Sequence, residues 1–199
     1  MATLIAIPCM DMVHTGFMCS LMDMDKPDGT RYSVTTTSLI YDARNILASS
    51  ALAGDFDRVL WLDSDMKLPK DALIRLSEDI DSGKEFVSGL YWTRKTPLKP
   101  CIYSDVWQKE IDGSVRGGAD NVTDIPDDIF EIKGCGFGCV LTSTKLLKQV
   151  WENYGPPFLP MARLGEDLSF CWRVSDMGVK MYCDPKVKVG HIGTMVYEV

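Results

Sequence analysis

The spacing of apolar and polar residues predicts strands and helices that alternate along the chain. Short runs of apolar or β-branched residues are typical of strands, whereas apolar residues three or four positions apart are typical of one helix face. Such alternation implies a mostly parallel central sheet flanked by helices, which is the α/β class. In the first part of the chain, the pattern predicts strands at 3–8, 31–36, 58–62 and 85–90, and helices at 13–24, 39–53 and from Pro69 onward.

The second half of the chain is less regular. Residues 93–132 are richer in Gly, Pro and Asp, and their strand candidates, at 101–104 and 129–133, are short. We therefore expect an irregular region there. Beyond it, the pattern predicts helices at 144–154 and 165–177 and strands at 180–183 and 187–189.

The length and composition are those of one folded domain. A chain of 199 residues with 46% hydrophobic and 25% charged residues lies in the ordinary globular range. Residues 1–10 lack a basic segment ahead of a long apolar run, and no stretch reaches the length that crosses a bilayer. The seven cysteines are scattered, without a C-x-x-C pair, which favours reduced thiols. We expect a cytoplasmic protein without membrane insertion.

The charge balance narrows the choice of partner. The net charge of −7 provides no general attraction to nucleic acid or to an anionic bilayer. If the protein binds a small anion such as a nucleotide diphosphate, a cation or a few local basic groups must hold it.

The segment WLDSDMKLP contains the strongest candidate for chemistry. It places Asp63, Ser64 and Asp65 directly after the strand predicted at 58–62. Ligands of open α/β sheets bind beyond the carboxyl ends of the strands, so we expect both carboxylates to face the binding crevice. Carboxylate oxygens suit Mg²⁺ or Mn²⁺, which can bridge the two phosphates of a nucleotide diphosphate. A solvated turn or a helix cap is the alternative interpretation, but the strand-end position favours the metal.

A histidine near the C-terminus is a candidate third ligand. His191 stands between two glycines in KVKVGHIG, at the predicted end of a short strand. A neutral imidazole binds divalent metals. A purely structural histidine is the alternative interpretation, and the residue alone does not decide between the two.

Two acidic residues at the start of a helix are candidates for proton transfer. Glu166 and Asp167 open the helix predicted at 165–177. Acids in a first turn stabilise a helix through its dipole, which is a sufficient structural reason for them. A carboxylate fixed at a helix end is also a suitable general base for a sugar hydroxyl.

One arginine and one glycine-rich segment complete the set of candidates. Arg44, in YDARN, has a guanidinium that could bind phosphate, a carboxylate of the metal motif or a surface partner. Gly134, Gly136 and Gly138 allow close approach of the backbone to a ligand. Their spacing differs from G-x-G-x-x-G, and they lack a strand before and a helix after them, which argues against a Rossmann dehydrogenase.

Taken in order, these segments resemble the GT-A fold glycosyltransferases, especially small bacteriophage and large-virus members related to the family 2 enzymes. The resemblance spans nearly the whole chain. It implies a nucleotide-sugar-binding half at 1–92 and an acceptor-side half with a small β region at 93–199, in one domain of a protein that can be longer. The segments that carry it are IPCMDMV, SLIYDARN, LWLDSDM, GCGFGCVL, GEDLSFCWR and VGHIG.

The resemblance also implies roles for individual residues. Asp65 and His191 would bind Mn²⁺ or Mg²⁺, and Asp63 would touch the ribose or the metal. Asp167 would be the base of an inverting displacement, and Glu166 would contact the acceptor. A metal-binding histidine is more familiar in retaining enzymes, so the stereochemistry stays open. The residues expected around the nucleotide are Pro8, Met10 and Asp11 beside the base and ribose, with Arg44, Asp63, Ser64 and Asp65 toward the rest of the donor.

These inferences converge on a metal-dependent glycosyltransferase. We expect transfer from a nucleoside diphosphate sugar, a UDP sugar in the first instance, to a hydroxyl of a glycan or glycoprotein. A nucleotidyltransferase acting on sugar phosphates is the second hypothesis, although residues 9–16 lack the basic group that would hold a triphosphate. A noncatalytic carbohydrate-binding module is the third. The sequence leaves the donor sugar, the acceptor and the oligomeric state open, and a viral origin would place the protein in the host cytoplasm.

Overall fold

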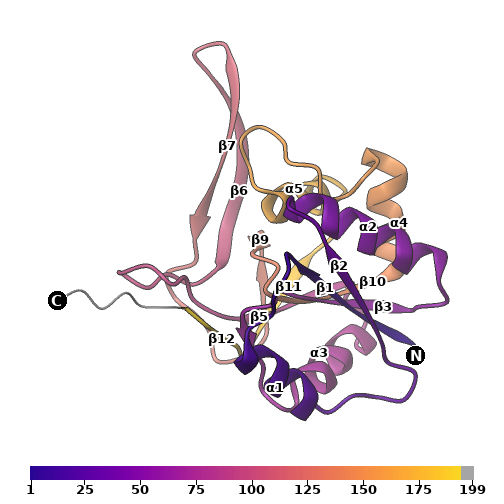
Figure 1. Cartoon of the computed structure of the whole chain (residues 1–199). Coiled ribbons are helices and arrows are strands. Elements are labelled where there is room, and N and C mark those ends of the chain that lie inside the picture. The colour runs from indigo at the N-terminus through magenta and orange to yellow at the C-terminus, as the bar shows by residue number, and fades with distance from the viewer. Residues whose placement is uncertain (194–199) are drawn as a thin grey trace.

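The computed structural model describes residues 1–193 as a seven-stranded sheet with helices on both faces and a long hairpin at one side (Figure 1). The helices are α1 (Thr15–Asp23), α2 (Ile40–Ala53), α3 (Ala72–Asp81), α4 (Thr144–Tyr154) and α5 (Glu166–Asp176). The strands of the large sheet are β1 (Thr3–Cys9), β2 (Arg31–Thr36), β3 (Arg58–Leu62), β5 (Phe86–Leu90), β8 (Phe130–Ile132), β10 (Cys139–Ser143) and β11 (Met181–Lys188). The smaller sheets contain β4 (Met66–Lys67), β6 (Ile102–Ile111), β7 (Ser114–Asn121), β9 (Gly134–Cys135) and β12 (Gly190–His191).

The strand order of the large sheet is β2-β1-β3-β10-β5-β11-β8. β1 pairs in parallel with β2 and β3, and β5 pairs in parallel with β11. β10 is antiparallel to both β3 and β5, so these two strands share a direction, and β8 is antiparallel to β11. Five of the seven strands therefore run the same way, which confirms the predicted mostly parallel α/β sheet.

Each face of the sheet has its own apolar core. In β1, Leu4 and Ala6 point to the core beneath α2, α4 and α5, whereas Ile5 and Ile7 point to the core beneath α1 and α3. This alternation follows from the two-residue period of a strand. Both faces are buried, so the central strands are mostly apolar, and the short apolar runs of the sequence are reliable strand signals.

The carboxyl ends of the parallel strands gather at one edge. β1 leads there into residues 10–14, β3 into Asp63, and β5 into Tyr91. The pairing of β1 with β3 ends at Ala6, whereas its pairing with β2 continues to Cys9. The ring of Pro8 therefore lies beyond the β1–β3 ladder, where a missing N–H costs no hydrogen bond with β3.

The region from 93 to 132 is more regular than predicted. β6 and β7 form an antiparallel hairpin from Ile102 to Asn121 that extends away from the large sheet (Figure 1). Its strands alternate poorly because much of the hairpin is exposed on both faces, which removes the periodic signal of a half-buried strand.

Three other elements differ from the predictions. β11 is one strand with an irregularity after Asp184, near Pro185, where the pattern predicts two short strands. α3 begins at Ala72, since residues 70–71 after Pro69 form a turn. β10 falls in and after the glycine segment, for which the pattern predicts no strand.

Within residues 1–193, no helix combines the length and the apolar character needed to cross a membrane.

Aromatic rings fill the core beneath α2 and α5. The rings of Trp61 and Phe158 are 4.9 Å apart between centroids, and those of Phe158 and Phe170 stack at 4.8 Å. Phe137 contacts the same ring of Phe158 edge-on at 5.1 Å. Phe158 thus joins the loop before α5 to β3 and the glycine segment.

Replacement of Phe158 by Ala is expected to lower the free energy of unfolding by about 3–5 kcal/mol, because it removes a fully buried ring at the centre of this cluster. Its neighbour Leu159 is 40% exposed, so Leu159→Ala should lower it by less than about 1 kcal/mol. Denaturant unfolding of both variants measures the difference. Equal losses would show that the cluster does not stabilise the fold in this way.

Candidate functional site

A cleft of about 560 Å³ lies at the edge where the parallel strands end. Its wall is formed by the ends of β1 and β3, the residue after β5, the start of α2, the start of α5 and His191 of β12. This is the position at which open α/β sheets bind their ligands. The residues named as candidates from the sequence that line it are Pro8, Met10, Arg44, Asp63, Ser64, Asp65, Glu166, Asp167 and His191.

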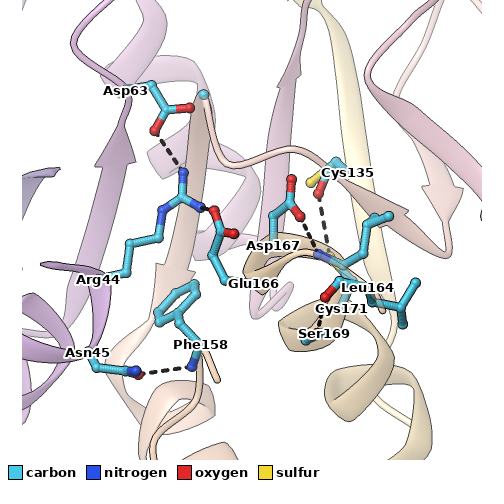
Figure 2. Close-up of polar contacts among 12 residues, drawn as sticks. Arg44, Asn45, Asp63, Cys135, Phe158, Leu164, Glu166, Asp167, Ser169 and Cys171 are labelled. Atoms are coloured by element: carbon cyan, nitrogen blue, oxygen red, sulfur yellow. Dashed lines mark hydrogen bonds and ion pairs between the residues drawn. The ribbon is translucent and has the colours of Figure 1, made fainter. Parts of the chain in front are cut away.

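Arg44 lies between two carboxylates at the floor of the cleft (Figure 2). Its Nη2 donates to Oδ1 of Asp63 at 2.7 Å, and its Nη1 donates to Oε1 of Glu166. The side chain is only 3% exposed. α2, the end of β3 and the start of α5 are thereby joined through one guanidinium.

The charge of Arg44 is sustained by its surroundings. Burial opposes the charge, but Asp63, Glu166 and Asp167 outweigh that effect and raise the pKa of Arg44 above its ordinary value. The guanidinium carbon lies 5.3 Å from the ring centre of Phe137 and 5.9 Å from that of Phe158. Aromatic faces add a favourable cation–π contact. Of the partners considered for Arg44, the structure shows the metal-motif carboxylate rather than a surface ion pair.

Asp65 and His191 meet on another wall of the cleft. Nε2 of His191 is 3.6 Å from Oδ2 of Asp65, and Nδ1 of His191 is 2.9 Å from the backbone oxygen of Trp92. A carbonyl oxygen can only accept, so this contact requires a proton on Nδ1. In a neutral imidazole, Nε2 then keeps its lone pair and directs it toward Asp65, the arrangement typical of a metal-binding histidine.

The two residues that open α5 have different environments. Glu166 is bound to Arg44, whereas Oδ1 of Asp167 accepts a hydrogen bond of 2.7 Å from the N–H of Leu168 (Figure 2). Burial and the neighbouring Glu166 carboxylate raise the pKa of Asp167 from 3.8 to about 6, against the opposing attraction of Arg44. A carboxyl group with a pKa this close to neutrality is well suited to proton transfer.

Tyr91 explains the glycine-rich segment. Its hydroxyl accepts a hydrogen bond of 3.2 Å from the N–H of Gly138, and a Cβ placed on Gly136 would lie 2.1 Å from that hydroxyl. A Cβ on Gly138 would lie 2.4 Å from the terminal carbon of Met66. Gly136 and Gly138 therefore leave the space that the side chains of Tyr91 and Met66 occupy. Burial, with Asp63 next in effect, raises the pKa of Tyr91 well above its ordinary value, so the hydroxyl stays protonated.

The loop after β1 extends the cleft on the expected nucleotide side. An adjoining cavity of about 480 Å³ shares Met10, Ser64 and Asp65 with the main cleft, and Asp11 lines it. The N–H of His14 donates to the backbone oxygen of Ser64 at 3.1 Å, which ties this loop to the Asp-Ser-Asp turn. Pro8 thus lines the main cleft and Asp11 the adjoining cavity, while Met10 and Ser64 border both.

No protein-family model matches the chain, and no curated protein matches it in sequence. Solved structures match it in fold. The viral protein A197 from STIV is similar over 100% of this chain and 98% of its own, with a TM-score of 0.67 and 21% identity. GalNAc-T7, crystallised with UDP, GalNAc and Mn²⁺, is similar over 98% of this chain, with a TM-score of 0.66 and 12% identity. TarS residues 1–349 from S. aureus are similar over 96% of it, with a TM-score of 0.57 and 12% identity.

These three structures are GT-A type glycosyltransferases. The chain has the GT-A fold. It spans 43% of the GalNAc-T7 chain and 60% of the TarS chain, but nearly the whole of A197. The GT-A fold confirms the resemblance noted in the sequence, including the likeness to a viral protein.

The GT-A core brings most of the predicted residues to one cleft but divides them into two groups. Asp63 and Glu166 are bound to Arg44, while Asp65 is next to His191. In the described part of the chain, no three His, Cys, Asp or Glu side chains form a ready metal centre. Metal binding by Asp63, Asp65 and His191 stays a prediction, with Asp65 and His191 already adjacent.

Sequence reasoning assigned no role to Arg94, although it lines the cleft and its Nη1 is 2.9 Å from Oδ2 of Asp65. The available signal was its place shortly after the end of the strand predicted at 85–90. The same rule that selected Asp63 would have selected the residues after Leu90.

Replacement of Asp167 by Asn is expected to stabilise the protein increasingly as the pH rises. Because the folded pKa of about 6 exceeds the ordinary 3.8, this carboxyl contributes stability below pH 3.8 that is lost as the pH rises through 6. An amide stays neutral throughout. Asp167→Asn should equal the wild type near pH 4 and exceed it at pH 8 by on the order of 2 kcal/mol, as measured by denaturant unfolding.

Glu166→Gln is the matched control for this experiment. It removes one carboxylate from the buried guanidinium of Arg44 and should destabilise the protein at pH 8. If Asp167→Asn were no more stable than the wild type at pH 8, burial of the ionised carboxylate would not destabilise the folded protein as expected.

Replacement of Gly136 by Ala is expected to destabilise the protein by about 2 kcal/mol, because the new methyl group collides with the Tyr91 hydroxyl. Tyr91→Phe removes that hydroxyl. The double variant should therefore be more stable than Gly136→Ala alone, although Phe leaves the N–H of Gly138 without its partner. Unfolding of the wild type and the three variants forms a double-mutant cycle, and purely additive losses would contradict the collision.

Proposed function

We propose that this protein is a metal-dependent glycosyltransferase that moves a sugar from a nucleoside diphosphate sugar, a UDP sugar in the first instance, to a hydroxyl of a glycan or glycosylated acceptor. The observation that carries the proposal is the content of one cleft. It combines an Asp–His pair suited to a divalent ion, a half-buried carboxyl group with a pKa of about 6, and the strand-end position of a nucleotide site.

Asp65 and His191 are the residues that would hold the metal. Nε2 of His191 and Oδ2 of Asp65 lie 3.6 Å apart, so that both could bind one Mg²⁺ or Mn²⁺ ion. The hydrogen bond of His191 to Trp92 fixes the tautomer that such an ion requires. When bound, a divalent ion offsets the negative charge on the departing nucleoside diphosphate. The crystallisation of GalNAc-T7 with UDP and Mn²⁺ supports this choice of donor and metal.

Asp167 is the residue proposed to act on the acceptor. Of the two acids that open α5, Glu166 is committed to Arg44, whereas Asp167 has one oxygen on the Leu168 N–H and faces the cleft with the other. Partial burial makes its carboxylate a stronger base than an ordinary aspartate. In an inverting transfer it takes the proton of the acceptor hydroxyl; in a retaining transfer its charge steadies the positively charged sugar.

Glu166, Arg44 and Asp63 are proposed to position the reacting groups. The network fixes the carboxylates of Asp63 and Glu166 before substrate arrives, so that neither of them has to be ordered during the reaction. Asp63 is then held beside the donor, where it can accept from a ribose hydroxyl, and Glu166 borders the acceptor. The loop with Pro8, Met10 and Asp11 encloses the base and ribose.

The test is nucleotide release from a panel of nucleoside diphosphate sugars in the presence of Mn²⁺. We expect UDP release that EDTA abolishes, and losses of at least about 100-fold for Asp65→Ala and Asp167→Asn. Asp55→Asn, on the exposed turn between α2 and β3, is the matched control and should retain full activity. Pyrophosphate release from a triphosphate would instead indicate a nucleotidyltransferase, and no turnover of any donor would indicate a noncatalytic module.

The dependence of this activity on pH supplies a second criterion. Only ionised Asp167 accepts a proton, so the rate of an inverting transfer should rise through about pH 6 and then level off. The anomeric configuration of the product, determined by NMR, distinguishes inversion from retention. A rate that is flat between pH 5 and 8 would contradict a role of Asp167 as base.

A further inference from the structure

Arg94 occupies an unusual position for a half-exposed arginine. It lies in the segment between β5 and β6, and its Nη1 contacts both Oδ2 of Asp65, at 2.9 Å, and the backbone oxygen of Ile192, at 3.0 Å. The same carboxylate oxygen faces Nε2 of His191 at 3.6 Å. A cationic group of the protein therefore sits at the oxygen that would have to bind a metal.

Arg94 and a divalent ion would compete for Oδ2 of Asp65. A metal at Asp65 would bring its positive charge within a few ångströms of the guanidinium, and like charges at that separation repel. The ion pair between Arg94 and Asp65 is also easily broken. The side chain of Arg94 is 50% exposed and that of Asp65 is 26% exposed, and exposed ion pairs contribute only about 0.2–1 kcal/mol to stability.

The cleft offers Arg94 a second partner. Among the described residues that line the cleft, the arginine and lysine side chains are Arg44 and Arg94. Both terminal nitrogens of Arg44 are engaged by Asp63 and Glu166 beneath the surface, so it is not free to move. A nucleoside diphosphate keeps negative charge even with one divalent ion bound. Arg94 is the long, half-exposed cation that can turn toward it.

We propose that Arg94 is an exchangeable counter-ion of the cleft. In the donor-free protein it neutralises Asp65; when the metal and nucleotide bind, it leaves Asp65 and binds a phosphate oxygen of the diphosphate. This inference rests on the proposed function. It makes Arg94 a positioning residue whose removal has opposite effects on two binding reactions, because it competes with the metal alone and assists the metal with nucleotide.

The experiment measures Mn²⁺ binding by electron paramagnetic resonance, first to the nucleotide-free protein and then with UDP. Arg94→Ala should bind Mn²⁺ alone about 2–5-fold more tightly, which corresponds to the loss of a competing exposed ion pair. With saturating Mn²⁺, the same variant should bind UDP about 10-fold more weakly in calorimetric titrations, because one charge-assisted phosphate contact is missing.

Lys95→Ala is the matched control, since Lys95 is an exposed cation of the same segment and does not line the cleft. It should change neither affinity. Arg94→Lys keeps the charge and should lie between the wild type and Arg94→Ala in both assays. Thermal melts of all variants show whether they fold equally well.

The outcomes separate this inference from the proposed function. If Asp65→Asn abolishes Mn²⁺ binding while Arg94→Ala leaves the Mn²⁺ affinity unchanged or lowers it, Arg94 is not a competing counter-ion, and the metal site stands. If Arg94→Ala tightens Mn²⁺ binding but leaves UDP binding unchanged, the transfer to phosphate is wrong. If the wild type binds neither Mn²⁺ nor UDP at millimolar concentration, both the inference and the proposed function fail.

Discussion

The buried charge of Arg44 is the interaction on which the rest of the site depends. A guanidinium that is 3% exposed is tolerated only with well-placed anionic partners, and its partners come from the end of β3 and the start of α5. The pairing therefore fixes the position of α5 relative to the sheet. The pairing also gives the two acids of α5 different environments. Glu166 forms an ion pair with the guanidinium of Arg44, whereas Asp167 is desolvated and lies beside the negative charge of Glu166, which raises its pKa.

Much of the fold follows from the sequence because the central strands are buried on both faces. The runs at 3–8 and 58–62 could be recognised without tertiary information, and the strand-end rule then placed Asp63 and Asp65 at the binding edge. Prediction of His191 beside Asp65 relied on the family resemblance, because no periodicity relates residues so distant in the chain. The structure confirms their proximity.

The features that could not be predicted depend on tertiary contacts, which sequence patterns do not encode. The β6–β7 hairpin is exposed on both faces and has no apolar alternation to detect. The glycines of GCGFGC resembled a ligand-approach segment, whereas Gly136 and Gly138 make room for Tyr91 and Met66. Likewise, whether Arg44 binds phosphate or carboxylate is decided by the depth at which α2 packs, which one helix sequence does not specify.

The reversed strand β10 has a consequence for how the protein can diversify. It lies between β5 and β3 and starts at the edge where they end, so that the chain leaves β5 and enters β10 at the same edge, beside the cleft. The intervening residues 91–138 form the β6–β7 hairpin and β9 outside the large sheet, and contribute β8 to its margin. Neighbouring strands are about 5 Å apart, so an excursion of almost any length closes the same small gap. Selection can therefore lengthen, shorten or replace the part of this excursion that lies outside the large sheet, the β6–β7 hairpin above all, without moving β3, β5 or β10.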